Sequence, residues 1–326
     1  MKSTKQLVVV AAEPGWLRGG DGLIEQFIAD QDVALSSRRT YRQSLTQFFG
    51  WLAREQDSAA PTRETILRYK EVLDARQLRP LTRSSYLVAV RKFFEWAEGR
   101  KYYPNIAKGV KGLRRSTKTH QRSALTLDQI GALLSAIERD SLRGIRDYAL
   151  INLLCRTGLR LIEVARAQLE DLEQRADGKA VLWVRGKGRE GKDEFVVITD
   201  EVMGPISCYL RERRPQALSA PLFASLSDRN LGKKLTTYSL SRIVKQRLRA
   251  IGIDTRRLSA HSLRHTFGVM AIRAGASLYE VQLAMRHTSP ATTEIYLGDI
   301  EQAKRLEGGP EQRIADLLKK LGGSGS

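Results

Sequence analysis

Hydrophobic residues in the first hundred positions recur every three or four residues, the spacing that places them on one face of an α-helix. These apolar stripes begin at Leu23 and return at 41–52, 66–73 and 86–97. Ser36 or Ser37 is a plausible N-cap of the second helix, and Thr62 directly precedes the third. The pattern predicts a bundle of amphipathic helices whose last member covers 82–99.

The pattern changes twice in the rest of the chain. Helical periodicity predicts 129–139, opened by a capping box of Thr126 and Gln129, and then Leu142–Thr157, ended by Gly158. Between 169 and 198 the period falls to two, and Ala180–Val184 and Glu194–Ile198 read as strands around a tight hairpin loop. Further helices are predicted at 160–167, from Asp200, and at 238–251, 262–275 and Leu278–Met285. This region is therefore predicted to be mainly α with a small antiparallel β-sheet.

Residues 109–122 separate the two regions. They contain glycine and many basic residues but no acidic residue, which is typical of an interdomain linker. Simple flexibility and contact with phosphates are both compatible with this composition. We expect the chain to divide into an N-terminal arm (1–20), a helical domain (21–108), the basic linker (109–122), a second domain (123–308), a C-terminal helix (309–321) and a linker-like tail (322–326).

The C-terminal helix follows a break at Gly308-Gly309-Pro310. Its apolar stripe consists of Ile314, Leu317, Leu318 and Leu321. A helix this short is marginal in water when isolated, so the stripe must be buried against another surface. That surface is either its own domain or, as we expect, a neighbouring protomer.

Charge narrows the class of partner. The chain has 55 Lys and Arg against 36 Asp and Glu, a net charge of +19, which favours a polyanion such as the phosphate backbone of nucleic acid. Some basic proteins never bind nucleic acid, but here the basic residues cluster near candidate chemistry. Cys155 and Cys208 lie in apolar, helical surroundings, which predicts buried roles, no disulfide framework and the reducing cytoplasm. We find no metal-ligand spacing, secretion signal or membrane-spanning run.

The candidate chemistry is an ordered set of polar residues. Arg160 comes first, His261 and Arg264 follow about a hundred residues later, and His287 and Tyr296 complete the set. Two arginines can hold phosphate oxygens, imidazoles can move protons or donate to the phosphoryl group, and a phenol can act as the nucleophile. These are the parts needed to attack a phosphodiester.

The same motifs give the chain a resemblance to a known family, the tyrosine site-specific recombinases, which include XerC/XerD, Cre and the phage integrases. Residues 157–164 resemble the family's first-arginine box, and residues 261–265 resemble its His-x-x-Arg box. Residues 287–296 resemble its second-histidine and nucleophile segment. The resemblance covers roughly 20–305. One departure is Arg286, which stands where members usually have the glycine of Leu-Gly-His-Ser.

The resemblance implies a fold and a reaction. The fold would be an N-terminal helical core-binding (SAM-like) domain plus an α+β catalytic domain, forming a C-shaped clamp on DNA. The reaction would be site-specific recombination through a 3′-phosphotyrosyl intermediate and a Holliday junction, without a cofactor or metal. The partner would be a specific double-stranded site, bound by a homotetramer on two duplexes or by a heterotetramer with a paralogue, in the cytoplasm on the nucleoid.

The resemblance also assigns roles to residues. The implied catalytic set is Arg160, Lys187, His261, Arg264, His287 and Tyr296. Lys187, in Gly186-Lys187-Gly188, would be the general acid; Lys192 is the weaker candidate, and a solvated turn lysine is the plain alternative. Glu163 either orients an arginine or forms a structural ion pair, and His265 is expected to be structural. The DNA-binding candidates are Arg38, Arg39, Arg42, Arg83, Arg91, Lys92, Lys111, Arg114, Arg115, Lys118 and Arg122.

Two other functions use similar features. A type IB topoisomerase has related chemistry but religates the same strand, and the amphipathic C-terminal helix favours the recombinase over it. A DNA-binding accessory protein that has lost catalysis would retain the charge, but the complete set of candidate catalytic residues disfavours that interpretation.

Overall fold

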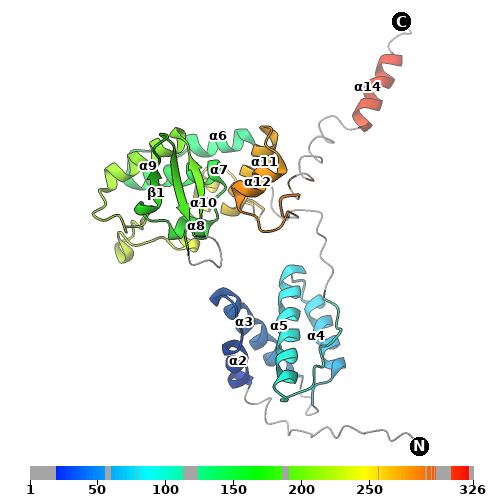
Figure 1. Cartoon of the computed structure of the whole chain (residues 1–326). Helices are drawn as coiled ribbons and strands as arrows, with labels where there is room; N and C mark the ends of the chain where they lie inside the picture. The colour runs from blue at the N-terminus through cyan, green and yellow to red at the C-terminus, as the bar shows by residue number, and fades with distance from the viewer. Residues whose placement is uncertain are drawn as a thin grey trace, which may run out of the picture. The chain divides into compact units, whose positions relative to one another are not determined.

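The computed structural model divides the chain into two compact units, Met1–Ser116 and Thr117–Ser326 (Figure 1). It describes residues 20–55, 60–78, 80–112, 124–185, 191–255, 257–290, 292–294, 296, 298 and 310–322. None of the described helices is long and apolar enough to cross a membrane.

The N-terminal unit is a helical bundle of α2 (Gly20–Ala29), α3 (Leu35–Leu52), α4 (Arg63–Ala75) and α5 (Pro80–Gly99). Helix α3 packs against both α2 and α5, and α4 packs on α5. The buried core is rich in aromatic rings, and Phe48 makes edge-on contacts with Tyr69 and Phe94. The predicted bundle is therefore confirmed, because its apolar stripes are the faces that meet in this core.

One predicted N-cap in this unit is wrong. Helix α3 begins at Leu35, so its N-cap is Ala34 and both Ser36 and Ser37 lie inside the first turn. The N–H of Ser37 donates to the Ala34 carbonyl at 2.8 Å, which starts the helix without a side-chain cap. Thr62, by contrast, does occupy the N-cap of α4, as its position predicted.

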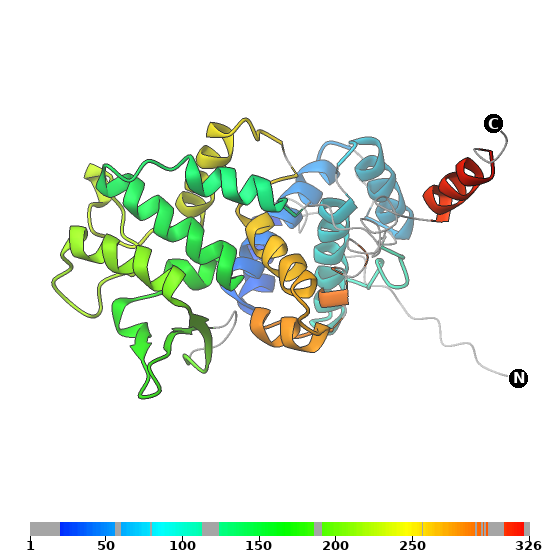
Figure 2. The same ribbon diagram turned by 90° about the horizontal axis from the view of Figure 1, so that it is seen from above.

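The second unit is mostly helical. Its elements are α6 (Leu127–Ser135), α7 (Leu142–Thr157), α8 (Leu161–Arg166), α9 (Asp200–Arg213), α10 (Thr237–Ala250), α11 (Ala260–Arg273), α12 (Leu278–Met285) and α14 (Pro310–Gly322). Helix α7 lies at the centre, where it packs along α9 and also contacts α6, α10 and α11 (Figure 2). The core around α7 contains Leu150, Leu153 and Leu154, each almost fully buried.

Among the described residues the sheet has three antiparallel strands, β1 (Leu172–Gln174), β2 (Ala180–Val184) and β3 (Glu194–Ile198), in the order β1-β2-β3. Strands β2 and β3 have the predicted bounds and pair in the register Leu182↔Val196. Strand β1 was not predicted, because three residues with two exposed side chains give no alternating apolar pattern. The mainly α fold with a small antiparallel sheet is confirmed.

Two smaller predictions for this unit are wrong. Helix α6 keeps its Thr126–Gln129 capping box but ends at Ser135, short of 139, because the chain then turns into Ser141, the N-cap of α7. Cys208 is exposed on α9, since it lies on the helix face opposite Val202, Ile206 and Tyr209. Cys155 is buried as predicted, and burial raises the pKa of its thiol to about 12.

Candidate active site

Arg160 lies at a sharp junction between two helices. Helix α7 ends at Gly158, whose left-handed backbone (φ 60°) favours glycine. A side chain there would also collide with Phe267, since a Cβ would lie 2.4 Å from Cδ1 of that ring. The turn makes Arg160 the N-cap of α8 and leaves its side chain 27% exposed. An arginine is thereby held at the start of a helix, with its guanidinium within reach of solvent.

Glu163 forms hydrogen bonds with two arginines at this junction. Its side chain is fully buried, and its carboxylate accepts from the Arg160 backbone N–H and from Nη1 of Arg160, both at 2.8 Å. Nη2 of Arg286 donates to the same carboxylate at 2.8 Å. Burial alone would raise the pKa of Glu163, but the charge and hydrogen bond of Arg286 and the hydrogen bonds of Arg160 hold that pKa below its usual value. Glu163 is thus a buried anion that orients two arginines.

Arg264 is the most deeply buried of the predicted catalytic residues that the structure describes. It lies in the second turn of α11, is 3% exposed, and donates to the carbonyls of Gly158 and Met285. Burial, and then repulsion from Arg160, lowers the pKa of Arg264 to about 10, so the guanidinium stays charged at neutral pH. His261 lies one turn earlier on the same helix and is exposed.

His287 follows directly after α12. Its Nδ1 lies 2.9 Å from the hydroxyl oxygen of Thr293, and the ring is partly buried. Burial first, and then the positive charges of Arg264 and Arg160, lowers the pKa of His287 to about 4. The imidazole is therefore neutral at physiological pH and can act as a hydrogen-bonding group rather than as a cation.

Tyr296 is buried, with 4% exposure, against the inner face of α11. Its ring centroid lies 4.9 Å from that of His265 and 6.1 Å from that of His287. Gly268 allows this approach, because a Cβ at that position would lie 2.6 Å from Cε2 of the tyrosine. Tyr296 and Arg264 also interact electrostatically. Of the predicted catalytic residues, the structure brings Arg160, His261, Arg264, His287 and Tyr296 into one electrostatically coupled cluster.

Lys187 belongs to 186–190, outside the described residues, so its role stays a prediction. Lys192 is described, and its ammonium forms ion pairs with Glu170, at 3.1 Å, and with the buried Asp171. The hydrogen bond to Asp171 is the main reason that the pKa of Lys192 is raised. A general acid needs a lowered pKa, so these contacts argue against Lys192 in that role.

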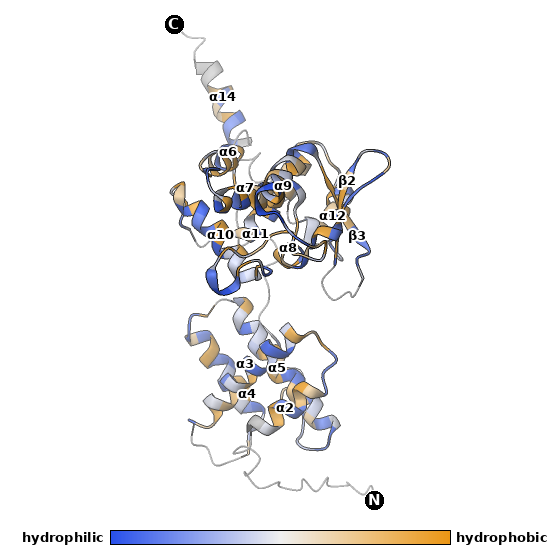
Figure 3. Ribbon diagram, turned by 90° about the vertical axis from the view of Figure 1, so that its left-hand side faces the viewer, coloured by the Kyte–Doolittle hydropathy of each residue, from blue (hydrophilic) through white to orange (hydrophobic). Residues whose placement is uncertain are grey.

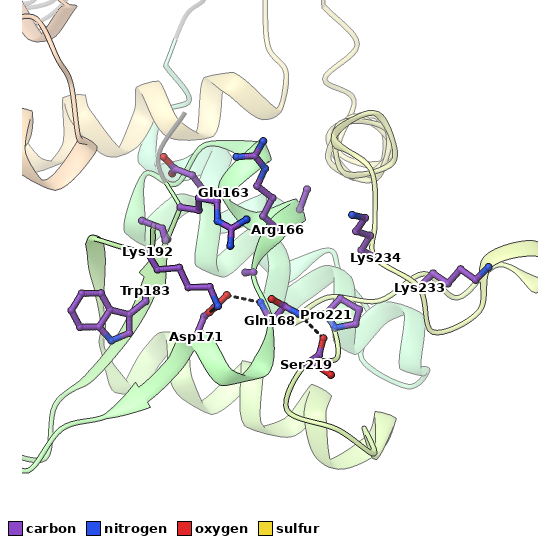
Figure 4. A pocket seen from close by; sticks show the side chains of 14 residues that line it. Glu163, Arg166, Gln168, Asp171, Trp183, Lys192, Ser219, Pro221, Lys233 and Lys234 are labelled. Carbon is purple, nitrogen blue, oxygen red and sulfur yellow. Dashed lines mark hydrogen bonds and ion pairs between the residues drawn. The ribbon is translucent and has the colours of Figure 1, made fainter. Parts of the chain in front are cut away.

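A cavity of about 830 Å³ lies beside this cluster, bounded by α8, by the end of β2 and Lys192 just before β3, and by the segment before α10 (Figure 4). Glu163 and Arg166 line it from α8, Lys192 from the hairpin, and Lys233 and Lys234 from the facing segment. Lys192 points toward Asp171 rather than into open space. Five of the lining residues are cationic and two are acidic, so the walls carry an excess of positive charge, which suits a phosphate-bearing ligand.

Sequence reasoning missed a second basic surface. Tyr238, with 74% exposure, lies near the start of α10, beside a shallow groove formed with Arg143, Arg242, Lys245 and Arg249. The spacing of three and four residues between the last three of these gives one basic helical face, so the signal was present in the sequence. It was overlooked because it carries no motif.

The predicted DNA-binding residues of the N-terminal unit have mixed surroundings. Arg42 pairs with Glu25 at 2.6 Å, Arg83 with Asp74 and Lys92 with Glu95, while Arg38 donates to the carbonyls of Gln31 and Val33. Arg39, Arg91 and Lys111 are exposed. Arg114, Arg115, Lys118 and Arg122 fall in 113–123, which the structure does not describe. Their contact with DNA stays a prediction.

Known proteins resemble both units. Residues 123–302 match the Phage integrase family, and residues 21–101 match the "Phage integrase, N-terminal SAM-like domain". Tyrosine recombinase XerD of Vibrio cholerae is 29% identical over 286 residues, 84% of this chain and 91% of the relative. Tyrosine recombinase XerD of Caulobacter vibrioides is 30% identical over 283 residues, 85% of this chain and 90% of the relative.

Solved structures share the fold. The XerH site-specific recombinase bound to its palindromic difH substrate, in a post-cleavage complex, aligns with a TM-score of 0.72 at 20% identity, over 90% of this chain and 85% of that one. A lambda integrase dimer (75–356) bound to a COC′ core site aligns with a TM-score of 0.63 at 14% identity, over 83% and 95%. With both domains matched and XerD relatives aligned along most of its length, the chain belongs to the phage integrase family and is a tyrosine recombinase, an enzyme of site-specific DNA recombination.

Proposed function

We propose that Tyr296 is the nucleophile of a strand-exchange reaction on double-stranded DNA. The observation that carries this assignment is the burial of Tyr296 between α11 and His287, inside a cluster that contains two arginines. The phenol oxygen attacks the scissile phosphorus, the bond to the 5′-oxygen breaks, and a 3′-phosphotyrosyl link forms. The link conserves the bond energy, so the 5′-hydroxyl of a partner duplex can displace the tyrosine without a nucleotide cofactor.

The other members of the cluster have complementary roles in this proposal. Arg160 and Arg264 hold non-bridging phosphate oxygens and stabilise the charge that develops on them, which suits a planar, permanently charged fork. His287, neutral at physiological pH, donates a hydrogen bond to the phosphoryl group. His261 accepts the phenolic proton, and Lys187 protonates the leaving 5′-oxygen.

Two such exchanges, through a Holliday junction, recombine two sites. We propose a tetramer on two duplexes, either of one chain or with a paralogue, and phosphate contacts from the N-terminal arginines and the basic linker. The lambda integrase tetramer bound to a Holliday junction, which shares the fold at a TM-score of 0.63, is compatible with this arrangement. The expected cytoplasmic, nucleoid-associated location stays a prediction.

We further propose that α14 docks on a neighbouring protomer. Its apolar side chains are exposed in the single chain, Ile314 by 57%, Leu317 by 58% and Leu318 by 61%. Hydrophobic positions recur along this helix between polar ones (Figure 3). Docking on the neighbouring protomer would bury this apolar stripe. It would also couple assembly to the position of Tyr296, which lies shortly before α14 in the chain.

The decisive experiment uses a nicked suicide substrate, from which the cleaved strand diffuses away and the covalent complex accumulates. Tyr296→Phe should bind this DNA with the affinity of the unaltered protein and form no denaturant-resistant adduct. Adducts that persist in Tyr296→Phe would identify another nucleophile.

A plasmid carrying two target sites separates the alternative functions. A recombinase exchanges the sites, a topoisomerase only relaxes supercoils, and an inactive accessory protein does neither. The target sequence for this plasmid comes from sequencing DNA that is covalently captured by the protein.

A further inference from the structure

Arg286 has an unusual backbone for an arginine. It caps the C-terminus of α12 in the left-handed conformation, with φ 54° and ψ 51°, a region that favours glycine over branched or long side chains. It is also buried, with its side chain 4% exposed. A strained backbone and a buried charge are both unfavourable, so compensating contacts are expected around this residue.

Those contacts lead to the predicted phosphate-binding arginines. Nη2 of Arg286 donates to Glu163 at 2.8 Å, and Nη1 donates to the Ala284 carbonyl at 2.7 Å. Nε lies 3.9 Å from the carboxylate of Glu194, too far for a hydrogen bond, at the first residue of β3. The guanidinium therefore connects its own turn to α8 by hydrogen bonds, and it lies only within ion-pair distance of the strand that follows the Lys187 loop.

The backbone of the same turn makes a second connection. The carbonyl of Met285 accepts from Nη2 of Arg264, and the carbonyl of Arg286 accepts from Nη2 of Arg160 at 2.7 Å. Two consecutive carbonyls thus hold two separate arginines. The direction of both carbonyls depends on the left-handed turn, which the Arg286 side chain restrains by its bonds to Ala284 and Glu163.

We propose that Arg286 is a positioning residue that fixes Arg160 and Arg264 for the scissile phosphate, by restraining the turn whose carbonyls hold them and by sharing the Glu163 carboxylate with Arg160. This inference rests on the function proposed above. Arg286 does not itself hold the phosphate, because its guanidinium is buried and directed at Glu163 and Ala284. A glycine in its place would satisfy the backbone but leave the turn and the Glu163 carboxylate less restrained.

The test compares Arg286→Gly and Arg286→Asn, two residues that tolerate a left-handed backbone. Single-turnover cleavage of the suicide substrate should fall about 10- to 100-fold, the loss expected from a misplacement of about 1 Å. DNA affinity should change by less than about threefold, because few of the many phosphate contacts are affected. Unchanged cleavage in both variants would overturn the proposal.

Arg214→Gly is the matched control. Arg214 is also an arginine at a helix C-cap with a left-handed backbone (φ 51°), but its side chain is exposed at the end of α9. Its replacement removes the same backbone strain without touching the cluster, so its cleavage rate should equal that of the unaltered protein. An equal loss of cleavage in Arg214→Gly and Arg286→Gly would mean that the turn contacts have no special role.

A double-mutant cycle and a titration identify the route of the effect. If Arg286 acts through Glu163, then Arg286→Gly should cost little further cleavage in a Glu163→Gln background, whereas additive losses would exclude this route. In the DNA-free protein, nuclear magnetic resonance should find the pKa of Glu163 higher in Arg286→Gly, and an unchanged pKa would overturn the contact itself. The two proposals can fail separately. If the unaltered protein forms no Tyr296 adduct, the proposed reaction fails, and with it the role of Arg286 in cleavage. A higher Glu163 pKa in Arg286→Gly would still support the contact between Arg286 and Glu163.

Discussion

A single methyl group added to α11 should separate folding from cleavage. Gly268 faces Tyr296, and a Cβ at this position would lie 2.6 Å from Cε2 and 2.9 Å from Cδ2 and Cζ of the ring. Carbon atoms pack at about 3.5–4.0 Å, so in Gly268→Ala the ring or the helix must move by about 1 Å. Such overpacking costs about 1–3 kcal/mol, while replacing glycine by alanine inside a helix returns about 0.5–1 kcal/mol. The net loss of stability is therefore about 0–2.5 kcal/mol.

Cleavage should respond much more strongly, because a displacement of about 1 Å at a reacting group can slow a reaction about 100-fold. The assay is the single-turnover rate of adduct formation on the suicide substrate, measured beside thermal unfolding. Gly131→Ala in α6 is the control, since the added Cβ meets nothing within 4 Å beyond its chain neighbours and its own helix backbone, and it should cleave at the normal rate. A normal rate in Gly268→Ala would refute the reasoning, because the tyrosine would then react from a position that does not depend on α11.

Three further predictions concern other parts of the chain. Lys187→Ala should cleave normal DNA slowly but a bridging 5′-phosphorothiolate almost normally, because a thiolate leaves without a proton; Lys192→Ala should show no such selective rescue. Acidification from pH 6.5 towards 4 should lower the melting temperature of the unaltered protein more than that of His287→Gln. The pKa of His287 is about 4 in the folded state and near 6.5 in the unfolded state, so over this range the proton binds the unfolded state preferentially. Equal falls in melting temperature with pH in the two proteins would contradict this prediction. Deleting residues 310–326 should leave single-site binding intact but weaken cooperative assembly and recombination in gel-shift and plasmid assays; full cooperativity would exclude the docking of α14 on a neighbouring protomer.

The elements that the sequence predicted best are those with strong local signals. Leu142–Thr157 has a capping serine before it and a left-handed glycine after it, and its bounds were predicted correctly. The two long strands have alternating apolar residues and a glycine-rich loop between them, and their bounds were also correct. Strand β1 depends on pairing with β2 rather than on its own residues, so no local pattern could reveal it.

The site shows the same limit. The order of the motifs predicted catalytic roles for Arg160, His261, Arg264, His287 and Tyr296, because residue types and spacing carry the family's chemistry. The structure brings these residues into one cluster, and their catalytic roles stay a prediction. Burial and partners are tertiary properties, so the sequence left open whether Glu163 orients an arginine, and the structure shows it holding Arg160 and Arg286 together. Arg286 looked like a departure from the glycine pattern, and only the turn around it revealed its contacts.

Helix-end carbonyls hold Arg160 and Arg264, the two predicted phosphate-binding arginines, in fixed positions. The last carbonyls of a helix have no partner within the helix, and its C-terminus carries a partial negative charge. Arg264 donates to Gly158, at the end of α7, and to Met285, at the end of α12, while Arg160 donates to Arg286 in the same turn. Each guanidinium thus satisfies orphan carbonyls before any DNA arrives. The helix ends pre-organise the cations, and the arginines in turn complete the caps, so the geometry for phosphate and the stability of α7 and α12 depend on the same hydrogen bonds.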